Sequence, residues 1–146
     1  MPAGETTTWR MLGAATRAHA LIYRLTRGLV GHRFRGSPPM LVLEHVGARS
    51  GVRRHHPLVY IRDGERLVLV ASKGGHPRHP SWFHNLRAHP DVTVQIGSRR
   101  IAVRARVADP AERVRLWPLA VEVYPGYERY AQRTAREIPL VVLEPR

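Results

Sequence analysis

Residues 91–107 read Asp-Val-Thr-Val-Gln-Ile-Gly-Ser-Arg-Arg-Ile-Ala-Val-Arg-Ala-Arg-Val, and this stretch decides the fold class. Apolar residues recur at every second position on both sides of Gly97-Ser98, a period that is typical of half-buried β-strands. The glycine–serine pair indicates a tight turn. The stretch therefore predicts an antiparallel hairpin. The residues expected to face inward are Val92, Val94, Ile96, Ile101, Val103, Ala105 and Val107.

Further strands are predicted on both sides of this hairpin. Residues 40–46 form an apolar run, and residues 57–62 and 66–72 flank an Asp63-Gly64 turn. The segment 66–72 is apolar on both faces, which indicates a strand covered from two sides. A last strand is expected at residues 138–143.

Prolines mark where helices begin and end between these strands. A short helix is predicted over residues 81–89, opened by Pro80 and stopped by Pro90. Pro110 begins a second helix to about residue 124, and a third is expected over residues 126–136. The order predicts an α+β chain, mainly β: a small antiparallel barrel with peripheral helices, over residues 40–146.

Residues 1–39 are predicted to be an amphipathic helical extension. Apolar residues from Leu12 to Leu29 fall on one stripe at helical spacing, and four arginines cluster opposite. Such a helix either packs on the core or lies on anionic lipid, so weak peripheral membrane association is one prediction.

Composition excludes several classes of protein. The 146 residues contain no cysteine, which removes disulfides, thiolate zinc sites and cysteine nucleophiles. No apolar run approaches the roughly 20 residues of a membrane helix, and arginines interrupt the first 30 residues, so a cytoplasmic protein is expected. Neighbouring histidines such as His55 and His56 point to opposite faces of a strand, and prolines separate the others, so no metal site is expected.

Charge gives the first indication of a ligand. Lysine and arginine exceed aspartate and glutamate by 24 to 11, a net charge of +13, and Lys73 is the only lysine. A surface of this kind attracts nucleic acid, anionic lipid, or a phosphorylated or carboxylated small molecule.

Two glycine-bearing segments are candidates for binding that anion. Residues 47–54 (Gly-Ala-Arg-Ser-Gly-Val-Arg-Arg) combine two glycines, whose amides can turn toward an anion, with three arginines. Ser72-Lys73-Gly74-Gly75 lies at the end of the strand 66–72, where backbone can approach a ligand closely. A solvated hairpin loop and a plain turn are the alternatives.

Two aromatic segments are candidates for the rest of a site. In residues 80–86, Trp82 and Phe83 could form a wall against a flat ring, with Asn85 as a hydrogen-bonding amide; the alternative places Trp82 in the core. Tyr124, Tyr127 and Tyr130 lie at steps of three, and their phenols could orient a carbonyl, quinone or nitro oxygen. Aromatic packing is the alternative.

Taken in order, these segments resemble the deazaflavin (F420)-dependent nitroreductase family, flavin and deazaflavin oxidoreductases of the FMN-binding-like split β-barrel fold. The resemblance runs from about residue 40 to residue 145. The segments that carry it are Ala71-Ser72-Lys73-Gly74-Gly75, His79-Pro80-Ser81-Trp82-Phe83-His84-Asn85-Leu86, Tyr124-Pro125-Gly126-Tyr127-Glu128-Arg129-Tyr130 and Ile138-Pro139-Leu140-Val141-Val142.

The resemblance implies hydride transfer from reduced coenzyme F420, a carrier with an anionic tail, to an electron-poor acceptor such as a quinone or nitroaromatic. It assigns Tyr124, Tyr127 and Tyr130 to the acceptor side. It assigns to cofactor binding Ala48, Arg49, Ser50, Arg54, His55, His56, Pro57, Leu58, Val59, Val70, Ala71, Ser72, Lys73, Ser81, Trp82, Phe83, His84, Asn85 and again Tyr127.

Two positions depart from the family pattern. Ala48 replaces one member of a basic pair, for which Arg53 could compensate, and Phe83 stands where a tyrosine is common. The alternatives are an FMN-binding reductase of the same fold and a non-catalytic anion- or nucleic-acid-binding protein; against nucleic acid, no nucleic-acid motif is present. The sequence leaves the oligomeric state open.

Overall fold

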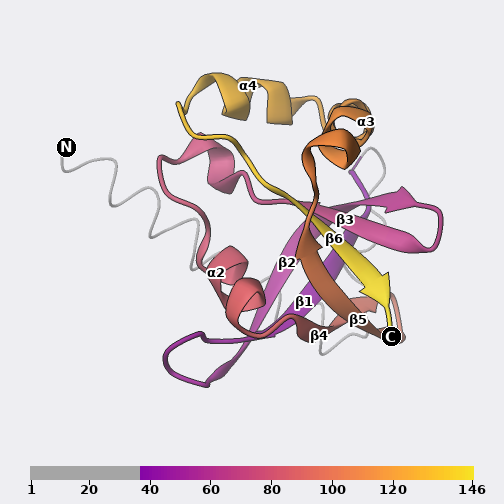
Figure 1. The fold of residues 1–146 in the computed structure, drawn as a ribbon. Coiled ribbons are helices and arrows are strands. Elements are labelled where there is room, and N and C mark those ends of the chain that lie inside the picture. Colours follow the sequence, from indigo (N-terminus) through magenta and orange to yellow (C-terminus); the bar gives the residue numbers. More distant parts are fainter. Residues whose placement is uncertain (1–36) are drawn as a thin grey trace.

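The computed structural model describes residues 37–146, in which six antiparallel strands close into a barrel (Figure 1). The strand order around the barrel is β1-β2-β3-β6-β5-β4, and pairing between β4 and β1 closes it. The predicted antiparallel barrel with helices on its outside is confirmed. The strands are β1 (Met40–Val46), β2 (Arg53–Asp63), β3 (Arg66–Val70), β4 (Asp91–Ile96), β5 (Arg99–Val107) and β6 (Leu140–Pro145).

The hairpin at residues 91–107 forms as the alternation predicts. β4 and β5 pair with Val94 opposite Ile101, and Val94 and Val103 are fully buried in the barrel interior. The prediction for Val107 is wrong, because its side chain is 45% exposed. The pairing with β4 ends with Asp91 opposite Arg104, so β4 does not cover Val107, which still pairs with Val141 of β6.

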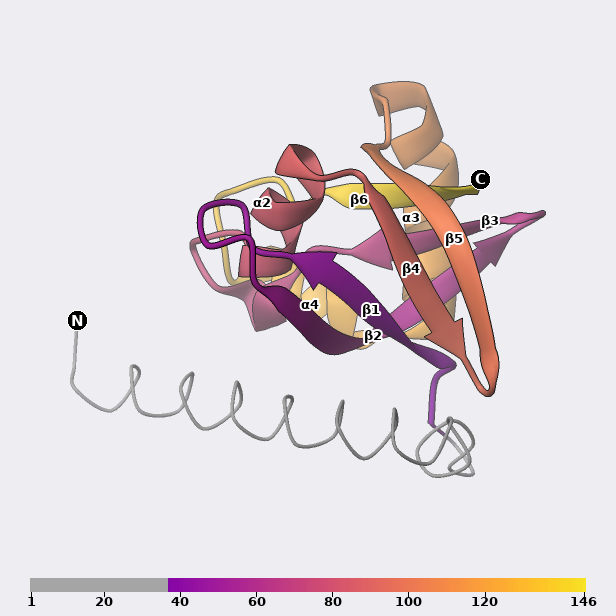
Figure 2. The same ribbon diagram turned by 90° about the horizontal axis from the view of Figure 1, so that it is seen from below.

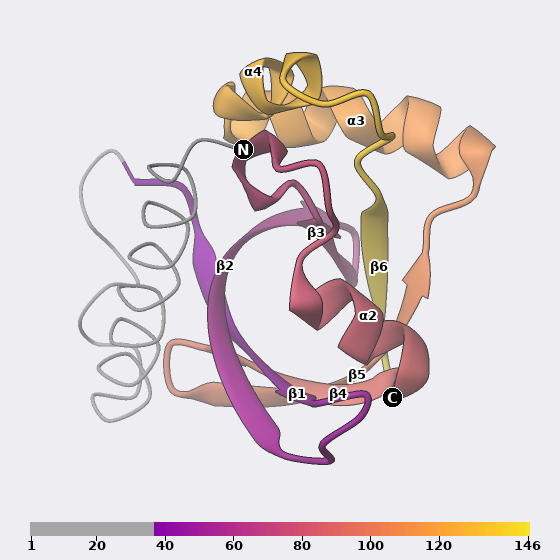
Figure 3. The same ribbon diagram turned by 90° about the vertical axis from the view of Figure 1, so that its left-hand side faces the viewer.

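β3 is covered on both faces, as its sequence indicates. Leu67 and Leu69 point into the barrel, whereas Val68 and Val70 pack outside it against the helices. The outer layer consists of α3 (Pro110–Val123) and α4 (Gly126–Gln132), which lie side by side along the barrel (Figure 3). Full burial of one such side chain contributes about 1.5–3 kcal/mol, so the two layers stabilise β3 jointly.

Two short helical segments lie between β3 and β4. They are the 3₁₀ turn η1 (Lys73–Gly75) and α2 (Ser81–Ala88), which crosses one end of the barrel (Figure 3). Trp82, Phe83 and Leu86 project from α2 into the barrel interior. α2 therefore closes this end of the barrel.

Several predicted boundaries are wrong. β2 begins at Arg53, not at residue 57, because Arg53 to His56 continue the pairing with β1 up to Val46. These four residues lack the apolar alternation of a half-buried strand, so the sequence pattern does not predict them as part of β2. β3 ends at Val70, two residues before its predicted end, and α4 ends at Gln132, four residues before its predicted end. β6 begins at Leu140, two residues after its predicted start.

The helix predicted within residues 1–39 lies almost entirely outside the described residues, as does its predicted contact with core or lipid. Among helices of residues 37–146, none has both the length and the apolar character needed to cross a bilayer.

Candidate functional site

Three segments gather at the end of the barrel that α2 closes, which we call the loop end (Figures 1 and 2). They are the β1–β2 loop, the segment from Ala71 to Pro80, and α2 itself. The β2–β3 turn and the chain's C-terminus lie at the opposite end. The loop end therefore brings together three of the four segments that the sequence singles out.

The β1–β2 loop is a tight, exposed turn. Gly47 N donates to Val52 O at 2.9 Å, and Gly51 N donates to Gly47 O at 3.0 Å. Gly51 adopts φ +67°, a left-handed conformation that favours glycine, and nothing lies within 4 Å of where a Cβ would be. The loop thus holds Arg49 and Ser50 exposed to solvent at the loop end.

Asn85 of α2 connects this loop to the barrel. Its Oδ1 accepts from Ala48 N at 2.9 Å, and its Nδ2 lies 3.0 Å from Nδ1 of His45. Burial, followed by the charges of His56, Arg54 and His55, lowers the pKa of His45 to about 4. His45 is therefore neutral at pH 7, and its Nδ1 can accept the hydrogen bond from Asn85. The sequence predicts Asn85 to be a hydrogen-bonding amide, and in these contacts its partners are protein atoms.

Strand alternation divides the predicted residues of β2 between two faces. Leu58 and Tyr60 pack in the barrel interior, so His56 and Arg54 belong to the same face. Burial lowers the pKa of His56 to about 4. The other predicted residues of β2, His55, Pro57 and Val59, belong to the outer face and so do not come together with Arg54 and His56. His55 lies 3.3 Å from Glu44 Oε1, and Val59 packs in the outer layer.

The segment from Ala71 to Pro80 carries Lys73 in an unusual backbone conformation. Lys73 has φ +46°, and Gly74 and Gly75 follow at +61° and +82°. The side chain of Lys73 is exposed, whereas Ala71 and Ser72 are buried. Burial, then the charges of Arg78 and Arg136, lowers the pKa of Lys73. Neighbouring cations therefore make an anion at this position favourable.

The basic side chains of the loop end lack carboxylate partners among the described residues, whereas seven arginines elsewhere have one. On the strands and α3, Arg100 pairs with Glu44, and Arg115 with Asp63. No described carboxylate lies within 4.0 Å of the six residues that we call the basic cluster, which is the strongest indication of an anion site. The basic cluster consists of Arg49, Arg53, Arg54, Lys73, Arg78 and Arg87.

The aromatic side chains of α2 are buried. Trp82 is 3% exposed and Phe83 is 4% exposed, both within the interior core. Ser81, His84, Arg87 and Ala88 are the exposed residues of the same helix. Trp82 and Phe83 thus hold α2 in the barrel, and the exposed residues, Ser81 and His84 among them, have surface available to a ligand.

The three tyrosines of the fourth segment lie together on and beside α4. The hydroxyls of Tyr124 and Tyr130 are 3.0 Å apart, and the hydrogen bond to Tyr124, then burial, raises the pKa of Tyr130. In such a pair one hydroxyl donates to the other, which leaves the second hydrogen available to a ligand oxygen. Tyr127 is buried beneath them and contacts Tyr124 edge-on, and burial raises its pKa.

Sequence reasoning missed two residues of this end of the barrel. His45 lies within an apolar strand, and only its burial with Asn85 distinguishes it. Arg136 donates to the carbonyls of Ala71, Ser72 and His76, but in a chain with so many arginines its position gave no signal.

A hollow of about 360 Å³ lies elsewhere, between β2 and α3. Its lining includes Tyr60, Ile61 and Leu119, and its charged residues are Arg62 and Glu122. One cation beside one carboxylate does not suit a polyanion, so charge favours the loop end.

Comparison with known proteins identifies the family of this chain. A family model described as F420H(2)-dependent quinone reductase matches residues 15–145. A Mycobacterium tuberculosis protein named F420H(2)-dependent quinone reductase is 45% identical over 130 residues, covering 87% of each chain.

Solved structures give the same result. A structure titled as an F420-H2 dependent reductase is 41% identical with a TM-score of 0.67, covering 73% of this chain and 94% of that one. Another, titled as a domain-swapped dimer, is 36% identical with a TM-score of 0.70, covering 87% and 96%. The predicted resemblance to F420-dependent reductases is confirmed, and the chain belongs to the F420H(2)-dependent quinone reductase family.

Proposed function

We propose that this protein reduces a quinone with a hydride from reduced coenzyme F420. Membership of the F420H(2)-dependent quinone reductase family supports both cofactor and acceptor. The structural observation that carries the proposal is the basic cluster at the loop end, together with the tyrosine hydroxyl pair on and beside α4, against which Gly75 packs.

The residues of the loop end fit a cofactor with an anionic tail. Arg49 and Arg54 offer guanidinium forks to phosphate or carboxylate oxygens, and Lys73 offers an ammonium. Arg78 and Arg136 repel the ammonium of Lys73, so binding an anion there relieves this repulsion as well as forming new contacts. The backbone amides around Gly51 add uncharged donors.

The flat head of the cofactor is assigned to the surface between α2 and residues 70–73. Ser81 and His84 are exposed there, and Trp82 and Phe83 support α2 from inside the barrel. Direct contact between the ring and Trp82 or Phe83 remains a prediction. Bound there in its reduced form, F420 supplies the hydride.

The tyrosine pair is assigned to the acceptor. A quinone oxygen gains negative charge as it receives hydride, and the free hydroxyl hydrogen of Tyr124 or Tyr130 can donate to it. Tyr130 keeps its proton at neutral pH, because the ordinary pKa of a tyrosine lies far above 7 and the contact with Tyr124 raises the pKa of Tyr130 further, so the pair is suited to donate a hydrogen bond to that oxygen.

A titration of the protein with oxidised F420 and, separately, with FMN tests the proposal. We expect F420 to bind more tightly than FMN, with an affinity that falls as salt rises, because the tail contacts are ionic. Reduced F420 should then be oxidised by menadione. Tighter binding of FMN, or no oxidation of reduced F420 by menadione, would overturn the proposal.

Weak peripheral association with anionic lipid, through residues 1–39, remains a separate prediction. Flotation of the protein with vesicles of anionic and of neutral phospholipid tests it. Recovery with the anionic vesicles alone would support the association, and recovery with neither would exclude it.

A further inference from the structure

The segment that presents Lys73 is held from outside chiefly by Arg136. Arg136, in the connection between α4 and β6, donates from Nε to His76 O at 2.9 Å, from Nη1 to Ala71 O at 3.2 Å, and from Nη2 to Ser72 O at 2.8 Å. Nη1 also lies 3.1 Å from Nδ1 of His79. One side chain therefore ties both ends of residues 71–76.

The backbone between those ends requires such a tether. A lysine in the left-handed region is strained relative to an ordinary conformation, and it persists only where its surroundings fix it. Gly75 packs so closely on α4 that a Cβ there would come within 2.7 Å of Tyr130 O. Arg136 and the backbone of α4 thus both hold this segment in place.

The guanidinium of Arg136 has little capacity left for a ligand. Arginine has five N–H donors, and the contacts with the three carbonyls and His79 occupy four of them. Burial, then the charge of Arg136, lowers the pKa of His79, which keeps its ring neutral and able to accept. Arg136 therefore acts on its protein neighbours.

We infer that Arg136 is a positioning residue for F420 binding: it fixes residues 71–76 so that Lys73 meets the anionic cofactor. The inference rests on the proposed function, because it needs Lys73 to contact F420. Arg133, just after α4, adds a longer contact to the same segment, from its Nη1 to Gly74 O at 3.4 Å.

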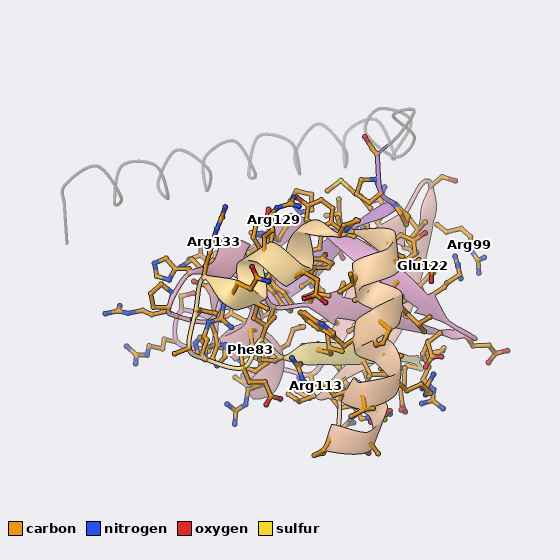
Figure 4. The ribbon with its side chains drawn as sticks, turned by 90° about the horizontal axis from the view of Figure 1, so that it is seen from above. Phe83, Arg99, Arg113, Glu122, Arg129 and Arg133 are labelled. Carbon is orange, nitrogen blue, oxygen red and sulfur yellow. The ribbon has the colours of Figure 1, made fainter. Side chains whose placement is uncertain are left out.

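Arg113 offers a matched control. It also donates to a carbonyl of this part of the chain, that of Ile138, and it pairs with Glu137 and stacks on Trp117. It lies on α3, in the outer layer (Figure 4), and these three contacts are all with residues outside the segment 71–76. A purely structural arginine contact would therefore behave like Arg113.

The test is the dissociation constant of oxidised F420, from fluorescence quenching, for the whole protein and for R136Q, R136K, R113Q, K73A and the double variant K73A/R136Q. Urea unfolding of each protein without ligand gives the cost to stability.

We expect R136Q and R136K to raise the dissociation constant of F420 about tenfold or more, because neither side chain can reach three carbonyls at once. We expect R113Q to change it less than twofold. We expect the double variant to bind no more weakly than K73A.

The outcomes separate the inference from the function on which it rests. If the unaltered protein does not bind F420, the proposed function fails. If it binds and R136Q binds as tightly, or R113Q weakens binding as much as R136Q, the inference fails. It fails equally if K73A has no effect, or if the effects of K73A and R136Q multiply, since Arg136 would then not act through Lys73.

Discussion

Two histidines at the loop end make the stability of this protein dependent on pH well above the range where carboxylates titrate. The pKa values of His45 and His56 are each about 4 in the folded chain, against an ordinary value of 6.5, chiefly because both rings are buried. The unfolded chain therefore binds protons below pH 6.5 that the folded chain refuses until about pH 4. Acidification through this window favours unfolding.

The magnitude follows from the two pKa values. Between pH 7 and pH 5, one histidine with this shift lowers the free energy of unfolding by about 2 kcal/mol, so the pair lowers it by about 4 kcal/mol. His76 and His79, whose pKa values are also lowered, act in the same direction. The lowered pKa of Glu112 contributes little here, because its stabilisation is lost only below its ordinary value of 4.5.

Urea unfolding at pH 7 and pH 5, followed by tryptophan fluorescence, measures this loss. We expect the unaltered protein to lose about 4 kcal/mol or more, and the double variant H45Q/H56Q to lose about 1 kcal/mol. Equal stability at the two pH values would refute the reasoning. An unchanged loss in the double variant would also refute it, because the effect would then come from other groups.

Three further predictions concern charge, catalysis and capping. Arg54→Ala should raise the dissociation constant of F420 about tenfold, whereas Arg99→Ala, at the far end of the barrel (Figure 4), should change it less than twofold; equal effects would contradict the basic cluster as the anion site. Tyr130→Phe should lower kcat with menadione about tenfold or more and leave F420 affinity within twofold; unchanged kcat would remove the tyrosine pair from the reaction. Glu112→Ala should lower the free energy of unfolding by about 1–2 kcal/mol, because it removes the capping box with Asp109 and the contact with Arg106, and urea unfolding that shows no loss would contradict this.

The fold could be predicted where burial alone determines the pattern of apolar and polar residues along a strand. In β4 and β5 one face is buried and the other wet, so Val94 and Val103 alternate with polar residues and reveal the hairpin. β3 is buried on both faces and reads as an apolar run. The start of β2 could not be predicted, because Arg53 to His56 pair with β1 at the loop end, where charged and titratable side chains replace apolar ones.

The candidate site could be predicted in outline but not in its contacts. Two glycine-bearing basic segments and the tyrosines were predictable from composition and spacing. That Trp82 is core, and that Asn85 bonds His45 and Ala48, depends on residues about 40 positions apart in the chain. Arg136 depends on a still longer connection, to Ala71 and Ser72. Local patterns carry no information about such pairings.

A crystal structure of the protein with oxidised F420 bound tests the central claim most directly. We predict that the anionic tail contacts Arg49, Arg54 and Lys73, and that the flat head lies against α2. A tail that lies away from the loop end, for example at the hollow between β2 and α3, would contradict the account.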